Sequence, residues 1–216
     1  MTARVIAVVG ASGVVGRALL EHLQASGETA LGFSRRAPAD LDTVTFCPLD
    51  LQDSKACSNA ANGPLKNVTH LVYTALFEEP GLIAGWRHAA QMQTNLLMLQ
   101  NLLAPLEQSS SLRHVTLLQG TKAYGVHVAP MKLPGLEREP RHDHENFYWL
   151  QQDYLTEVCR TNHWHYTIWR PQIIFGHALH APMNLLAALG VYAALQQAQH
   201  LPFSYPGGPS AISEAV

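Results

Sequence analysis

The sequence predicts an α/β fold built on a doubly wound parallel β-sheet with helices on both faces. Short runs of apolar and β-branched residues alternate along the chain with segments of helical periodicity. The strand-like runs are apolar almost throughout, which is typical of parallel strands covered on both faces. This alternation indicates strand–helix–strand units with right-handed crossovers. The 216 residues are enough for one well-filled core and too few for two domains of ordinary size.

Each element follows from its local pattern. The first strand is expected at 4–10, and the segment 13–27 is expected to form a helix that ends at Gly27. Five further strands are expected at 29–34, 44–50, 69–75, 113–120 and 165–170. Helices are expected between them at 51–61, 81–108 and 145–162. No repeat or low-complexity stretch interrupts this order.

The composition argues against several functional classes. With 47% hydrophobic residues, 14% charged residues and a formal charge of −2, the chain has the composition of a soluble globular protein. Its 14 lysines and arginines form no basic run, so we expect no nucleic-acid partner. No apolar run approaches the ~18 residues that a membrane span needs, so we expect no membrane contact. The segment 1–13 enters a strand and a glycine turn directly, without the pattern of a signal peptide.

The cysteines and histidines form no recognisable metal or disulfide pattern. Cys47, Cys57 and Cys159 are odd in number and share no CxxC spacing, which favours a reducing cytoplasm. The histidines within 142–144 and 163–165 form i, i+2 pairs without a third ligand at a typical spacing. We therefore expect no metal site.

The strongest local motif is "VVGASGVVGRALL", which carries Gly10, Gly13 and Gly16 between the first strand and the first helix. The first glycine permits a tight turn, the second permits close approach of a pyrophosphate, and the third permits close packing of helix on sheet. A phosphate would lie at the positive end of the helix. The motif thus predicts a Rossmann-type NAD(P)-binding fold, with a merely structural turn as the alternative. Its GxxGxxG spacing is that of the short-chain dehydrogenase/reductase superfamily.

The end of the second strand indicates which dinucleotide binds. An acidic residue there would accept the ribose 2′-hydroxyl of NAD, whereas this chain has Arg35 and Arg36, whose forked donors suit a 2′-phosphate. NADP(H) is therefore expected, and two solvated surface arginines are the alternative. Asp50 and Leu51 follow the third strand, where such folds hold the adenine, although an aspartate there can also cap the next helix.

Further cofactor contacts are expected around the same edge of the sheet. They are Ser12, Val14 and Val15 in the glycine turn, Ser34 beside the arginines, Thr74 and Ala75 after the fourth strand, and Gln119 after the fifth. After the sixth strand, Pro171, Ile173 and Ile174 are expected beside the nicotinamide carboxamide, or alternatively in plain core.

A Rossmann-type reductase usually carries its catalytic tyrosine in a Tyr-x-x-x-Lys motif, and this chain has none. Gln152 stands four residues after Tyr148, and the four lysines all lie elsewhere, at positions 55, 66, 122 and 132. Lys122 follows the carboxyl end of the fifth strand, where open α/β sheets bind ligands. We expect Lys122 and Tyr148 to meet over the nicotinamide, the alternative being a loop cation and a half-buried aromatic residue.

Five segments together resemble the progesterone 5β-reductase and iridoid synthase-like (PRISE) branch of the extended short-chain dehydrogenases. They are "GASGVVG", "SRR", "LLQGTKAYG", "ENFYWLQQDYL" and "WRPQIIFGHALHAPMN", in that order along nearly the whole chain. The resemblance implies that Lys122 and Tyr148 are the catalytic pair. Trp149 stands where many plant members have a second tyrosine, which supports Tyr148 as the functional one.

The resemblance implies hydride transfer from NADPH to the β-carbon of an enone or enal, with a small hydrophobic carbonyl substrate that is steroid-like or terpenoid-like. Charge then develops on the carbonyl oxygen, where Tyr148 would donate a hydrogen bond and Lys122 would stabilise charge and lower the tyrosine pKa. A cofactor-binding sensor without turnover is a second hypothesis. An epimerase or alcohol dehydrogenase of the same fold is a third, which the missing Tyr-x-x-x-Lys disfavours.

The expected domain organisation follows from the resemblance. Residues 1–176 form the dinucleotide-binding domain, and residues 177–216 begin a substrate-binding portion that is incomplete compared with family members. The stripe 96–103 is expected in a helix core or at a homodimer contact. The substrate, the stereochemistry of reduction and the oligomeric state do not follow from the sequence.

Overall fold

The computed structural model describes residues 4–41, 44–79, 86–108, 111–181 and 184–204. Within these residues, parallel strands form one six-stranded sheet in the order β3-β2-β1-β4-β5-β6. The strands are β1 (Val5–Val9), β2 (Thr29–Ser34), β3 (Thr45–Pro48), β4 (His70–Tyr73), β5 (His114–Leu118) and β6 (His165–Trp169). The strand order reverses between β1 and β4, which confirms the doubly wound sheet.

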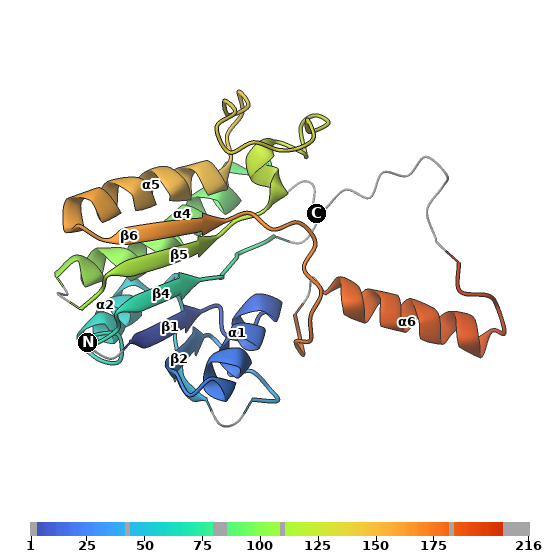
Figure 1. The fold of residues 1–216 in the computed structure, drawn as a ribbon, viewed down its shortest axis with the longest axis horizontal. Helices are drawn as coiled ribbons and strands as arrows, with labels where there is room; N and C mark the ends of the chain where they lie inside the picture. Colours follow the sequence, from blue (N-terminus) through green and yellow to red (C-terminus); the bar gives the residue numbers. More distant parts are fainter. Residues whose placement is uncertain (1–3, 42–43, 80–85, 109–110, 182–183, 205–216) are drawn as a thin grey trace.

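Helices cover the two faces of the sheet unequally (Figure 1). Helix α1 (Val14–Ala25) lies on one face, and α2 (Ser54–Asn62), α4 (Ala89–Leu103) and α5 (Phe147–Asn162) pack side by side on the other. Two short 3-10 helices, η1 (Ala104–Gln108) and η2 (Thr121–Tyr124), follow α4 and β5. Helix α6 (Leu185–Ala198) projects away from the sheet, and none of its residues is buried.

The main core lies between the sheet and α2, α4 and α5. Leu71, Val115 and Leu117 from the strands and Leu99 and Leu155 from the helices are fully buried there. The smaller core under α1 contains Ile6, Val8, Ala11, Leu20 and Leu23. The apolar runs predict strands covered on both faces, but the two edge strands, β3 and β6, contain no buried residue, and Trp169 of β6 is 61% exposed.

Capping residues explain most differences between expected and observed helix boundaries. Asp53 accepts a bond from the Ala56 amide, 2.9 Å, so α2 begins at Ser54 rather than at 51. Asn146 accepts one from the Tyr148 amide, 2.9 Å, and starts α5.

The long helix expected at 81–108 is shorter in the structure. Helix α4 begins at Ala89, because Trp86 and Arg87 form a turn before it, and residues 81–85 lie outside the described residues. The segment ends as the 3-10 helix η1, where Pro105 lacks the N–H that an α-helix would use.

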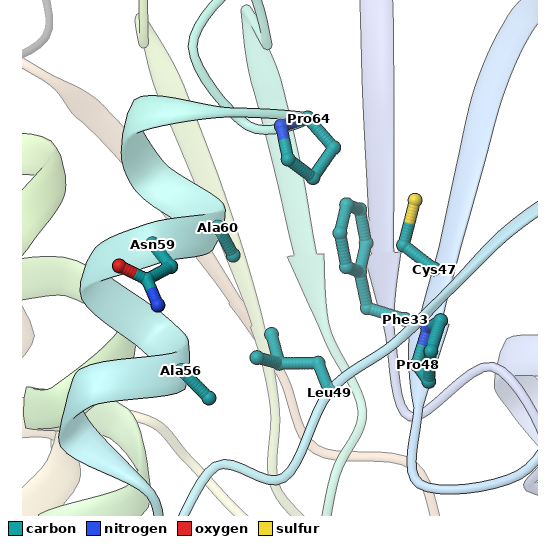
Figure 2. A pocket seen from close by; sticks show the side chains of 8 residues that line it. All are labelled: Phe33, Cys47, Pro48, Leu49, Ala56, Asn59, Ala60 and Pro64. Atoms are coloured by element: carbon teal, nitrogen blue, oxygen red, sulfur yellow. The ribbon is translucent and has the colours of Figure 1, made fainter.

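A cavity of about 310 Å³ lies between α2 and the strands β2 and β3 (Figure 2). Its lining is mainly apolar and includes Phe33, Leu49 and Pro64. None of the residues expected to bind a cofactor lines it. The cavity lies at the carboxyl ends of β2 and β3, where Phe33 and Leu49 immediately precede Ser34 and Asp50 in the chain.

Candidate active site

The glycine turn has a backbone that only glycine fits. Gly10 has φ +96°, and a Cβ atom there would lie 2.8 Å from the Ala75 amide nitrogen. A Cβ atom on Gly16 would overlap the carbonyl group of Gly10, so helix α1 packs directly on the turn. The turn leaves β1 beside β4, at the point where the strand order reverses, and open α/β sheets bind ligands at this point.

The N-terminus of α1 is left open for an anion. Its N-cap, Gly13, has extended backbone and provides no side-chain cap, and the first turn contains no acidic residue. The first N–H groups of α1, beginning with Val14 and Val15, therefore present uncapped donors and the positive end of the helix. A Cβ atom on Gly13 would lie 3.4 Å from the Gly10 carbonyl oxygen. These features fit a dinucleotide pyrophosphate, with the half-buried Ser12 in the same turn.

The arginines expected to bind a 2′-phosphate are exposed at the end of β2. Ser34 donates a hydrogen bond to the Arg36 carbonyl, 2.6 Å, and tightens the turn that carries them. No described carboxylate forms an ion pair with Arg35 or Arg36. Their guanidinium groups therefore remain available to an anion, as the 2′-phosphate prediction requires.

A different arginine, which the sequence pattern did not single out, anchors the loop after β2. Arg17 of α1 is buried and binds both carboxylate oxygens of Asp40 at 2.9 Å, and it also binds Glu21 at 2.8 Å. The hydrogen bond from Arg17 lowers the pKa of Asp40 to about 2. Asp40 also contacts His177 Nε2 at 2.6 Å, which links the loop to the segment after β6.

The two residues expected beside the adenine differ in their surroundings. Asp50 is exposed and accepts a hydrogen bond from the Gln52 amide, 3.0 Å, while the neighbouring Asp53 caps α2. The Leu51 side chain is buried in the main core and its carbonyl accepts a bond from Asn101, 2.9 Å. Because the Leu51 side chain packs into the core, its backbone is the part left for a contact with adenine, and that contact stays a prediction.

The residues after β4 and β5 that are expected to contact the cofactor mainly form contacts within the protein. The Thr74 hydroxyl donates to the Val9 carbonyl, 2.9 Å, and Ala75 packs beside Gly10. Gln119 is buried, donates to the Tyr148 carbonyl at 2.7 Å and accepts from Arg170 at 2.9 Å. Both ends of the Gln119 side chain are thus engaged within the protein, and its contact with the cofactor stays a prediction.

The residue in the usual lysine position has a partner of its own. Gln152 Oε1 accepts a hydrogen bond from Arg170 Nη2 at 2.7 Å, and the Arg170 guanidinium lies 5.1 Å from the centre of the Tyr124 ring. Arg170 thus contacts Gln152 in α5, Tyr124 in η2 and Gln119 directly after β5. A lysine at position 152 would bring a second cation against the Arg170 guanidinium, whereas Gln152 offers it an acceptor.

Lys122 and Tyr148 are brought to the same edge of the sheet. The Asn146 side chain connects them, because its amide donates to the Lys122 carbonyl at 2.7 Å and accepts from the Tyr148 amide. A Cβ atom on Gly120 would lie 3.4 Å from Tyr148 Oη and 3.7 Å from the Pro171 carbonyl oxygen. The tyrosine hydroxyl therefore lies at the carboxyl end of β5, as the sequence predicts.

Both side chains contact a residue that sequence reasoning missed. Lys122 Nζ lies 3.9 Å from the centre of the Trp86 ring system, and the rings of Trp86 and Tyr148 meet edge to face at 5.2 Å. Trp86 lies in the connection between β4 and α4, a segment assigned to a helix on its apolar content. Trp86 stands well beyond the end of β4 in the sequence, and no local pattern indicates its contact with Lys122.

The electrostatics of the pair differ in part from the expectation. Burial lowers the pKa of Lys122, and the nearby Glu78 carboxylate opposes this shift. Burial, with a further contribution from Glu78, raises the pKa of Tyr148 above its ordinary value of 10. The expected lowering of the tyrosine pKa is thus wrong, because desolvation of a side chain that is only 9% exposed raises it. The raised pKa keeps the Tyr148 hydroxyl protonated at physiological pH, so it has a proton to donate in a hydrogen bond.

The segment after β6 crosses the glycine turn. The Pro171 carbonyl lies near Gly120, and a Cβ atom on Gly176 would lie 2.6 Å from Val14 Cγ1. Ile173 is half-buried and Ile174 is 37% exposed, so neither belongs to the interior core. This path brings the residues after β6 beside the turn, and their contact with a nicotinamide remains a prediction.

The fold and this arrangement define an NAD(P)-binding protein of the short-chain dehydrogenase/reductase type. The sequence profile of the NAD dependent epimerase/dehydratase family matches residues 6–201, and the chain belongs to this family.

Two relatives whose names describe an activity are similar to the chain over most of its length. The chain is 30% identical over 215 residues to the (S)-8-oxocitronellyl enol synthase of Catharanthus roseus, which covers 93% of this chain and 53% of that protein. It is 29% identical to the 3-oxo-Delta(4,5)-steroid 5-beta-reductase of Arabidopsis thaliana, over 94% of this chain and 55% of that protein. These relatives confirm the resemblance to the progesterone 5β-reductase and iridoid synthase-like enzymes. The chain spans about half the length of the curated relatives it matches.

A solved structure confirms the fold. The Thermus thermophilus UDP-glucose 4-epimerase in complex with NAD superposes with a TM-score of 0.71 at 19% identity, over 94% of this chain and 67% of that one. Among the described residues, no group of three or more histidine, cysteine, aspartate or glutamate side chains is arranged so that it could hold a metal ion. In the same residues, no helix combines the length and apolar character that crossing a bilayer requires.

Proposed function

We propose that the chain is an NADP(H)-dependent reductase of α,β-unsaturated carbonyl compounds that have a hydrophobic, steroid-like or terpenoid-like body. The observation that carries the proposal is the placement of Tyr148 and Lys122 at the carboxyl end of β5, where both side chains contact Trp86, without a Tyr-x-x-x-Lys motif. Support also comes from two relatives whose names describe an enol synthase and a steroid 5β-reductase. The three free thiols are compatible with the reducing cytoplasm, where we place the protein.

The cofactor contacts follow from the glycine turn outward. The uncapped first turn of α1 binds the pyrophosphate, while Arg35 and Arg36 bind the 2′-phosphate and so select NADP(H) over NAD(H). When bound, the nicotinamide supplies the hydride that reduces the β-carbon of the substrate. We expect the apolar residues after β6, including Ile173, to lie beside the nicotinamide.

Tyr148 and Lys122 act on the substrate carbonyl. As the double bond is reduced, negative charge develops on the carbonyl oxygen. The Tyr148 hydroxyl, neutral because burial raises its pKa, donates a hydrogen bond to this oxygen. The Lys122 ammonium stabilises the same charge from η2. The buried rings of Trp86 and Phe147 pack against Tyr148 and keep water from that side of the tyrosine.

Turnover assays distinguish this function from its alternatives. We expect NADPH oxidation with a panel of cyclic enones and terpenoid enals, and no activity with secondary alcohols or nucleotide sugars. Tight NADPH binding without turnover of any enone would instead indicate a cofactor-binding sensor. Activity on a nucleotide sugar or an alcohol would identify another chemistry of the same family.

A further inference from the structure

Trp86 is the centre of a small hydrophobic cluster that is separate from both cores. The other members are Met92, Ala123, Phe147 and Tyr148. The Trp86 side chain is almost fully buried, at 4% exposure, although it lies in a connection between β4 and α4. A large aromatic side chain buried in a connecting segment indicates a specific local role, because connections usually lie on the surface.

Three kinds of contact fix the Trp86 ring. Its indole N–H donates to Glu78 Oε1 at 3.0 Å. Its ring packs on Phe147 at 4.6 Å and on the edge of Tyr148 at 5.2 Å between ring centres. The Lys122 ammonium nitrogen lies 3.9 Å from the ring centre, well within the range of a cation–π interaction. One side chain thus contacts both members of the candidate catalytic pair.

We propose that Trp86, oriented by its hydrogen bond to Glu78, is the positioning residue that holds the Lys122 ammonium beside Tyr148. This inference rests on the proposed function only for its effect on turnover, since the placement of the ammonium is a property of the chain itself. A lysine side chain is flexible, and the indole face removes much of that freedom. The geometry of the pair is then set by two residues before α4 rather than by a shared helix.

Glu78 adds a charge that acts on both members of the pair. It raises the pKa of Lys122 against the effect of burial and contributes to the raised pKa of Tyr148. On the other side, the loop after η2 contributes His127, whose pKa is about 4 because of burial and the charges of His144, Lys122, Arg87 and His142. Glu78 is therefore the charged group that favours the ammonium form of Lys122, and removing it should lower the pKa of that ammonium.

The first experiment observes Lys122 directly and needs no turnover. With four lysines in the chain, NMR of ¹³C-labelled lysine side chains gives a spectrum in which Lys122→Arg assigns one signal. We expect the Lys122 ε-CH₂ protons to be shifted upfield by the Trp86 ring. Trp86→Leu should return the signal to the position of the other lysines, and Trp86→Phe should keep part of the shift. Trp169→Leu removes an exposed tryptophan and should leave the signal unchanged.

The second experiment separates positioning from packing. Trp86→Leu should reduce kcat about tenfold with little change in the NADPH KM, and Trp86→Phe should recover part of the loss. Glu78→Gln should move the basic limb of the pH–rate profile to lower pH. The neighbouring Glu79→Gln should not move it, because Glu79 pairs with His88 at 2.8 Å instead.

The outcomes distinguish this inference from the proposed function. An unshifted Lys122 signal in the wild-type protein overturns the placement of the ammonium on Trp86. A shifted signal with an unchanged pH profile in Glu78→Gln overturns the role of Glu78. The signal can be shifted in the wild-type protein and lose that shift in Trp86→Leu while the protein reduces no enone. That result supports the placement of the Lys122 ammonium on Trp86 and rejects the proposed reductase function. Because Trp86→Leu removes a buried ring, melting curves of all variants are recorded, and Glu78→Gln supplies the test if that variant unfolds.

Discussion

Tyr148 reaches the carboxyl end of β5 from the first turn of α5, where Asn146 fixes the start of the helix. The Tyr148 hydroxyl lies beside Gly120. It is neutral because burial raises its pKa. Tyr148→Phe removes the donor to the carbonyl oxygen, and we expect kcat to fall on the order of 10²-fold with NADPH binding little changed. Steady-state kinetics and NADPH titration measure the two effects. Tyr166→Phe, on the exposed side of β6, is the control, and full turnover of every enone by Tyr148→Phe would refute the mechanism.

Gln152 provides a second test at the residue scale. Restoring the usual motif by Gln152→Lys would place an ammonium against the Arg170 guanidinium, which now donates to Gln152 at 2.7 Å. We expect this variant to lose about 1–2 kcal/mol of unfolding free energy and not to restore activity to Lys122→Gln. Gln152→Glu keeps an acceptor for Arg170 and should be at least as stable as wild type in the same denaturant titrations. A stable Gln152→Lys that rescues Lys122→Gln would show that the motif position is still functional.

Arg35 and Arg36 test the choice of cofactor. Replacing both with neutral residues should weaken NADPH binding much more than NADH binding, because each charge-assisted contact to a 2′-phosphate contributes ~1.5–3 kcal/mol. Fluorescence titrations with both cofactors measure the difference. Arg160→Gln on α5, which removes a charge paired with Glu157, should change neither affinity. Equal losses for NADPH and NADH would contradict the assignment.

At the scale of elements, Arg17 and Asp40 join α1 to the loop between β2 and β3. The pKa of Asp40 is lowered from an ordinary value of 3.8 to about 2, so its ion pair stabilises the fold above pH 3.8 and is lost as the pH falls through 2. Asp40→Asn should therefore lower Tm at pH 7, and its difference from wild type should shrink between pH 4 and pH 2. Thermal melts across this range provide the measurement, with the exposed Asp143→Asn as the control. A Tm difference independent of pH would contradict the ion-pair account.

Local patterns predicted the elements better than the contacts between them. The six strands and the glycine turn follow from short apolar runs and from Gly10, Gly13 and Gly16, because backbone sterics and burial act over a few residues. The contact between Trp86 and Lys122 joins residues from different connections, and no periodicity encodes it. Gln119 was assigned to the cofactor by its position after β5, whereas its bonds to Tyr148 and Arg170 depend on how α5 and β6 pack.

At the scale of the whole molecule, the sheet is covered well on one face and poorly on the other. Helices α2, α4 and α5 bury the main core, whereas α1 covers only part of the opposite face and β6 remains exposed (Figure 1). The candidate cofactor-binding residues lie within the well-packed part of the chain. The portion expected to bind substrate begins after β6, and that division stays a prediction.

Helix α6 gives the prediction that belongs to this scale. It is apolar on every side, buries no residue and exposes large side chains, among them Leu186 at 49%, Val191 at 62% and Leu195 at 54%. Because exposed apolar surface of this kind favours association, we expect concentration-dependent self-association and binding of a hydrophobic dye. Sedimentation velocity and dye fluorescence measure these properties. The triple variant Leu186→Gln, Val191→Gln, Leu195→Gln should reduce both without lowering Tm, because these side chains add nothing to the core. A monodisperse wild-type monomer that binds no dye would show that α6 is covered in solution.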